Sequence, residues 1–248
     1  MGTVGGVVTA PRKLDEILGN APPTTIAHVV ERLRAVDDVL PIGDGVGWFT
    51  KLYLEVTEAV GAAVVPGGFR NPTFLAQLDV SFANLFFEAL RLAARNPSAT
   101  PKAWAPLVEA RNERDIAPIQ FAFAGMNAHI NRDLPVAIVS TCEQTGVNLD
   151  HAAREYADFE RVNSLLKVTE TRVKAWFATG FVGIVDAALG DVDDRIAMWD
   201  VARARDAAWV QAQTLWALRS VPELQSQFLA TLDHVIGFAG RGLLVPVT

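Results

Sequence analysis

The chain has 248 residues, 50% of them hydrophobic, and carries a formal net charge of −6. This length can bury one large core, and the short Pro- and Gly-containing clusters leave no long linker, so we expect one domain. No apolar run reaches the ~18 residues of a membrane span, and no basic stripe interleaved with aromatic residues points to nucleic acid. The single cysteine, Cys142, cannot form an internal disulfide, which suits a reducing cytoplasm.

Apolar residues recur at spacings of three and four along most of the chain, which is the helical period. This pattern predicts an all-α fold over 1–248, a single-domain bundle of about eight to ten helices with a central polar-lined pocket. Residues 1–22 are expected to form a loosely ordered N-terminal arm. Capping signals are Thr24 or Thr25, Asn71 with Pro72, Asp115 with Pro118, and Asp150. The expected helices are 25–39, 45–64, 72–95, 101–112, 116–134, 136–144, 150–178, 181–189, 194–219 and 221–238.

The segment GlyMetAsnAlaHisIleAsnArgAspLeuPro, 125–135, interrupts the apolar stripe of the 116–134 helix. Asp133 falls on the same face as Met126, and His129 lies one turn before it. A carboxylate in an apolar stripe is costly unless it is paired. A His and an Asp four residues apart could hold one metal ion or form a hydrogen-bonded acid–base couple. Because Pro135 has no N–H, we expect the helix to kink or stop near Leu134 and open a pocket there.

Other expected helices also carry polar side chains within or beside their apolar stripes. The acidic ones are Asp79, which shares a stripe with Phe82, and Asp158. The uncharged ones are Tyr53, Asn84, Asn127, Asn131 and Asn163. Together they suggest a shared polar cavity inside a helical bundle. Each of them taken alone could instead be a satisfied core residue, with Asp79 or Asp158 paired to an arginine such as Arg205.

Five blocks of the sequence resemble a known family. They are TyrLeuGluValThr (53–57), LeuAspValSerPheAlaAsn (78–84), GlyMetAsnAlaHisIleAsnArgAspLeu (125–134), AspPheGluArgValAsn (158–163) and AlaArgAspAlaAlaTrp (204–209). They are similar to an uncharacterised, mainly actinobacterial, all-helical domain-of-unknown-function family. That resemblance implies a helical fold and brings no activity.

A weaker resemblance links His129, Asp133 and Pro135 to the phospholipase C and P1-type nuclease superfamily. The further histidine of that motif is missing here. With four histidines in the chain, the full trinuclear zinc site of that superfamily is not expected.

The sequence favours a small-molecule enzyme of bacterial metabolism, with secondary metabolism as one setting, that acts on a rather apolar substrate. The predicted catalytic residues are His129, Asp133, Asp158 and Asp79, with His129 and Asp133 as metal ligands if one divalent metal is bound. The predicted substrate-binding residues are Tyr53, Asn127, Asn131, Asn84, Asn163, Met126 and Phe82. Metal-assisted hydrolysis, a metal-free cyclisation or isomerisation in a natural-product pathway, and a non-catalytic hydrophobic-ligand binding protein stay open as alternatives. No nucleotide or flavin motif is present, and a homodimer is left open.

Overall fold

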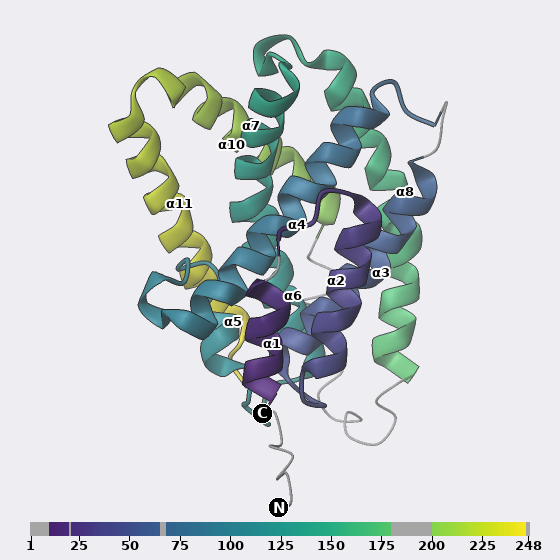
Figure 1. Cartoon of the computed structure of the whole chain (residues 1–248), viewed down its shortest axis with the longest axis vertical. Helices are drawn as coiled ribbons and strands as arrows, with labels where there is room; N and C mark the ends of the chain where they lie inside the picture. Colours follow the sequence, from purple (N-terminus) through teal and green to yellow (C-terminus); the bar gives the residue numbers. More distant parts are fainter. Residues whose placement is uncertain (1–9, 20, 65–67, 180–199, 247–248) are drawn as a thin grey trace, which may run out of the picture.

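Helices form nearly all of the chain in the computed structural model, which describes residues 10–19, 21–64, 68–179 and 200–246 (Figure 1). The side chains are described within 13–19, 21–64, 68–167 and 200–246. No strand occurs among these residues, and the all-α prediction is confirmed. The helices are α1 (Ala10–Gly19), α2 (Ile26–Val39), α3 (Gly45–Ala63), α4 (Pro72–Arg95), α5 (Ala105–Ala110), α6 (Pro118–Ala128), α7 (Leu134–Thr145), α8 (Ala153–Thr179), α10 (Val201–Ala217) and α11 (Pro222–Leu243). None of the described helices is both long and apolar enough to cross a membrane.

Capping side chains explain why the predicted starts of three helices agree with the structure. Thr25 accepts a hydrogen bond from the backbone N–H of residue 28 at the start of α2, and Asp44 accepts one from residue 46 at the start of α3. Asn71 accepts from residue 74 at the start of α4, with Pro72 in the first turn. These oxygens satisfy backbone donors that have no partner within the helix.

Three predictions about the ends of elements were wrong. Part of the expected N-terminal arm is helix α1, because Leu14 and Leu18 are buried against the core. Helix α5 is shorter than the expected 101–112. Asp150 does not cap α8; it lies in a short 3-10 turn, Leu149–His151, that precedes the helix. The expected helix 181–189 and the residues 194–199 of the next lie outside the described residues.

A kink or a stop of the helix was expected near Leu134. The helix does not stop there, because a π turn over His129–Asp133 joins α6 to α7. In this turn the backbone N–H of Leu134 donates to the carbonyl of His129, five residues earlier. The wider turn passes the point where Pro135 has no N–H to donate, so the helical path continues. Single π turns inside α-helices often occur at functional sites.

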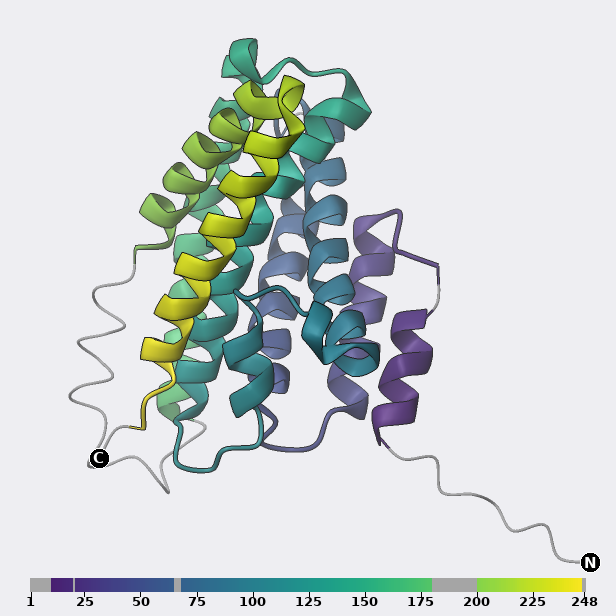
Figure 2. The same cartoon turned by 90° about the vertical axis from the view of Figure 1, so that its left-hand side faces the viewer.

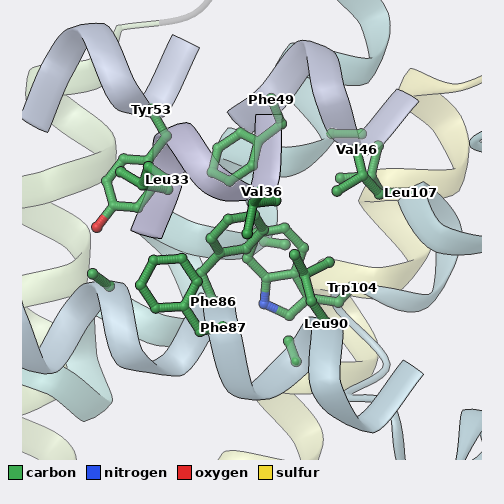
Figure 3. Packing of buried hydrophobic residues seen from close by; sticks show 14 of the residues in the cluster. Leu33, Val36, Val46, Phe49, Tyr53, Phe86, Phe87, Leu90, Trp104 and Leu107 are labelled. Atoms are coloured by element: carbon green, nitrogen blue, oxygen red, sulfur yellow. The ribbon is translucent and has the colours of Figure 1, made fainter. Parts of the chain in front are cut away.

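The π turn lies where two hydrophobic clusters meet. Figure 2 shows α10 and α11 on one side of the bundle and α1 and α2 on the opposite side. The first cluster contains Phe49, Phe86 and Trp104, which Figure 3 shows packed between α3 and α4. The second is built on α7, α8 and α10. Phe82 and Met126 are partly buried and pack against both clusters.

Candidate active site

His129 and Asp133 form a buried hydrogen-bonded couple on the π turn. The imidazole Nδ1 lies 3.1 Å from Asp133 Oδ2, and the side chains are 3% and 0% exposed. The indole Nε1 of Trp104 donates to the same oxygen over 2.9 Å, and Arg132 Nη1 donates to Asp133 Oδ1 over 2.7 Å. These contacts use both carboxylate oxygens, so the charge of Asp133 is paired although it is fully buried.

A closed network holds this carboxylate in place. Arg132 Nε lies 3.6 Å from Asp233 Oδ1 on α11. Asp233 in turn accepts hydrogen bonds from the backbone N–H groups of residues 102 and 103, over 2.7 and 3.0 Å. Residue 103 is followed directly by Trp104, whose indole N–H donates to Asp133. The network therefore joins three separate segments of the chain around Asp133.

Burial and the Asp133 carboxylate also determine the protonation and tautomer of the His129 ring. Burial lowers the pKa of His129 from its usual value near 6.5, and the neighbouring Asp133 carboxylate opposes that shift. A neutral imidazole that faces a carboxylate through Nδ1 carries its proton there and donates it. The other nitrogen, Nε2, is then an unprotonated acceptor. It is buried and has no hydrogen-bond partner among the described residues.

Aromatic rings surround the His129 imidazole. The Phe82 ring stacks on it, with centroids 3.5 Å apart and planes at 5°. The Tyr53 ring meets it edge to face, at 4.6 Å and 73°. The remaining rings within 6.1 Å are those of Phe49, Phe86 and Trp104. This enclosure explains why burial is the dominant influence on the imidazole.

Two further polar atoms at this cluster also lack partners among the described side chains, namely the hydroxyl of Tyr53 and Oδ2 of Asp79. Burial raises the pKa of Asp79 from 3.8 to about 7. Burial and then the charge of Asp79 raise the pKa of Tyr53 well above its usual value, with a smaller contribution from Asp133. Thr57 lies near enough to oppose this shift, but its hydroxyl donates to the Tyr53 carbonyl over 2.8 Å.

Gly125 allows α3 to approach α6 closely enough to build the cluster. A Cβ atom at this position would lie 2.3 Å from the Phe49 ring, far inside van der Waals contact. Because Gly125 has no side chain, Phe49 can pack directly on the α6 backbone, and Tyr53 follows one turn later on α3. The glycine of the 125–135 segment thus has a packing role that its helical position alone did not indicate.

The structure separates Asp158, a predicted catalytic residue, from this site. Its two oxygens accept the backbone N–H groups of Arg70 and Asn71, over 2.9 and 2.6 Å, at the start of α4. Asp79 is two turns further on, about 12 Å along the helix axis. Asp158 therefore anchors α8 to the beginning of α4 and is not brought together with His129 and Asp133.

The four predicted asparagines also bind protein groups away from His129. Asn163 accepts from Arg205 over 2.6 Å, and Asn84 donates to the Pro23 carbonyl over 3.0 Å. Asn127 donates to the carbonyl of residue 236 on α11 and accepts from Asn131. The expected single polar cavity is thus several separate polar contacts. Of the predicted site residues, four lie with His129 and Asp133 at the junction of the two clusters, namely Tyr53, Asp79, Phe82 and Met126.

The residues present do not favour the predicted metal pair. The described part of the chain holds no group of three or more His, Cys, Asp or Glu side chains arranged around a common point. Asp133 Oδ2 already accepts from Trp104 and faces His129 Nδ1, and Asp133 Oδ1 accepts from Arg132. The geometry matches the other interpretation of the sequence, the hydrogen-bonded acid–base couple.

Sequence reasoning missed two residues of the site, Trp104 and Asp233. A tryptophan among apolar residues ordinarily indicates core packing, and the Trp104 ring is indeed fully buried, but its indole N–H also orients Asp133. Asp233 lies 101 residues from Arg132 in the chain and had no local feature to mark it. Cys142 is buried, and burial raises the pKa of its thiol to about 12, so this thiol is not an activated nucleophile.

Comparison with protein-family models places the whole helical core in one family. The model of a family of unknown function, DUF5995, matches residues 26–246. The chain belongs to this family. No curated protein matches the chain, and no solved structure does. The resemblance to a domain-of-unknown-function family is thereby confirmed, whereas nothing in these comparisons supports its mainly actinobacterial character or the weaker resemblance to phospholipase C and P1-type nucleases.

Proposed function

We propose that this protein is an enzyme that moves a proton on a small, rather apolar substrate, with His129 as the general base. The observation that carries the proposal is the unpartnered Nε2 of a neutral imidazole whose Nδ1 faces a buried carboxylate. Buried polar atoms are nearly always hydrogen-bonded, so an unpaired acceptor in an aromatic cluster has a cost that a reactive role explains.

The roles of the other groups follow from their contacts. When Nε2 accepts a proton, the ring becomes an imidazolium, and the fully buried Asp133 carboxylate stabilises that charge. Trp104 and Arg132 donate to its two oxygens and hold the carboxylate in a fixed direction. A base placed in this way contributes about 10²- to 10⁴-fold in rate. Both Asp133 oxygens are occupied, which favours isomerisation or cyclisation over metal-assisted hydrolysis.

The surroundings of the base define the kind of substrate. Phe82 and Tyr53 contact the imidazole, and neither carries a charge. Phe82 and Asp79 are half-buried, so the α4 edge of the cluster is the side nearest to solvent. A flat, uncharged molecule entering from this edge would displace or slide beside Phe82. The setting we propose is bacterial metabolism in the cytoplasm, the compartment that a single cysteine suits.

A generic proton-abstraction assay tests this proposal without knowledge of the natural substrate. Nitrobenzisoxazole is planar and apolar, and a base that removes its ring C–H breaks the N–O bond and releases a coloured nitrophenolate. We expect the wild-type protein to accelerate this elimination, and His129→Gln to lose at least about tenfold of the rate. The matched control is His234→Gln, since His234 is exposed on α11 and contacts only the carbonyl of residue 230 in its own helix.

Two further measurements keep the test decisive if His129→Gln folds poorly. Asp133→Asn should also slow the elimination, because an amide no longer stabilises the imidazolium. The wild-type rate should fall only at a pH below the usual histidine value of about 6.5, since burial lowers the pKa of His129 and protonation removes the base. A wild-type rate no greater than that of buffer, or equal rates for the His129 and His234 variants, contradicts the proposal.

A further inference from the structure

The two other unpartnered atoms suggest what His129 acts on. The Tyr53 hydroxyl and Asp79 Oδ2 are buried at the same cluster, yet neither makes a hydrogen bond to the other or to His129 Nε2. Three unpaired polar atoms border one ring cluster, and each has hydrogen-bonding capacity that no described protein group uses. Two of the three are oxygens that can carry a proton, and the third is the proposed base.

Their arrangement follows from the two helices that hold them. Asp79 and Phe82 are three residues apart on α4 and share a face of the helix. The Phe82 ring lies on the His129 imidazole, and its centroid is 6.0 Å from that of Tyr53. Asp79 is near enough to Tyr53 for its charge to raise the pKa of the phenol. In Figure 3 the Tyr53 hydroxyl points away from Trp104, towards the edge of the ring cluster.

The protonation states make this pair a donor site. Burial raises the pKa of both groups, so below about pH 7 each holds its proton. A phenol and a neutral carboxylic acid that both donate to one substrate oxygen in an apolar site stabilise the negative charge that develops on it. The base, His129, carries no proton at Nε2. Two donors and one base together match a substrate that loses a proton and gains negative charge on an oxygen.

We propose that the substrate is a neutral, apolar ketone with a hydrogen on the carbon next to the carbonyl, and that the reaction is its enolisation. This inference rests on the proposed function, because it uses His129 as the base. His129 Nε2 takes the proton from the α-carbon, and the C–H electron pair becomes the C=C bond of an enolate. The carbonyl oxygen takes the charge and accepts hydrogen bonds from Tyr53 and Asp79. The imidazolium then returns a proton to the same or a conjugated carbon, so atoms and charge balance without a further reactant.

Binding of β-naphthol tests the donor pair independently of His129, because the oxygen of a naphthol occupies the place of the enolate oxygen. We expect Tyr53→Phe and Asp79→Leu each to weaken naphthol binding, by about tenfold to a hundredfold for the tyrosine variant, because neither replacement can donate a hydrogen bond. His129→Gln should retain binding within a few-fold. The matched control is Tyr156→Phe, because Tyr156 lies at the surface and packs against Phe159 and Trp209, away from the site. Circular dichroism shows whether each variant folds.

Proton exchange of β-tetralone in heavy water tests the complete reaction. The wild-type protein should speed deuterium incorporation beside the carbonyl, Tyr53→Phe should slow it about 10²-fold, and His129→Gln should abolish it. Wild-type protein that does not bind naphthol, or Tyr53 and Asp79 variants that bind it as tightly as wild type, would overturn the inference. If that happens while nitrobenzisoxazole elimination still depends on His129, the general base stands and only the ketone substrate is wrong.

Discussion

Asp79→Asn should stabilise the protein at neutral pH and have almost no effect in acid. An amide has the shape of a protonated carboxyl group, so the substitution removes the charge and little else. Burial raises the pKa of Asp79 from 3.8 to about 7 in the folded state. In the unfolded chain the carboxyl ionises above pH 3.8, whereas the folded protein holds the proton until about pH 7. The wild-type protein therefore loses stability as the pH rises between these two values.

The size of the effect follows from that difference. At 1.36 kcal/mol per pKa unit, a shift from 3.8 to about 7 corresponds to about 4 kcal/mol. Because Asp79 is half-buried rather than fully enclosed, solvent screening reduces the expected gain to about 2–3 kcal/mol above pH 7. The His129 contribution is the same in both proteins and cancels in the comparison.

Urea unfolding at several pH values between about 4 and 8 measures this gain. The difference between variant and wild type should be near zero at pH 4, grow up to pH 7 and stay constant above it. Asp15→Asn provides a control of opposite sign, since Arg95 lowers the pKa of Asp15 and loss of that ion pair should slightly destabilise the protein. A gain that does not vary with pH, or a loss of stability at pH 7, would refute the account of Asp79 as a carboxyl kept neutral by burial.

Three other substitutions or reactions test separate parts of the site. Asp133→Ala should cost about 3–5 kcal/mol in urea unfolding, because it leaves buried donors without a partner; a loss below 1 kcal/mol contradicts the network. Gly125→Ala should lower the free energy of unfolding by about 1–3 kcal/mol, since the new Cβ overlaps the Phe49 ring, and unchanged stability would show that α3 and α6 can separate at no cost. Cys142 should react with a thiol reagent only after unfolding; rapid reaction in the native protein would mean that the thiol is accessible.

The sequence predicted the helices well where local chemistry decides the structure. The caps at Thr25 and Asn71, the proline at the start of α4 and the three-and-four spacing of apolar residues are all properties of neighbouring residues. The couple of His129 and Asp133 was predicted for the same reason, because residues four apart share a helix face. The continuation through Pro135 was not, since a helix can pass a proline by widening one turn instead of ending.

The predicted members of the site failed where partners come from distant parts of the chain. Asp158 has the same position beside an apolar stripe as a catalytic carboxylate would have, but it binds backbone groups 87 and 88 residues away. The side-chain amide of Asn127 likewise donates a hydrogen bond to the carbonyl of residue 236. Trp104 was missed because a buried indole and one that also donates to a carboxylate give the same sequence pattern. Polarity within an apolar stripe thus marks a buried contact, and the tertiary structure decides whether that contact is already satisfied.

The proton position on His129 is the most direct test of the central claim, that a buried neutral imidazole presents an unprotonated Nε2. Two-dimensional correlation of the ring nitrogens and carbon-bound protons, on protein labelled with ¹⁵N-histidine, distinguishes the two tautomers from the imidazolium. We expect the His129 proton on Nδ1 at about pH 7, Nε2 in the range of an unprotonated nitrogen, and a ring pKa below 6.5. A proton on Nε2, or a charged ring at that pH, would contradict the assignment of His129 as the base.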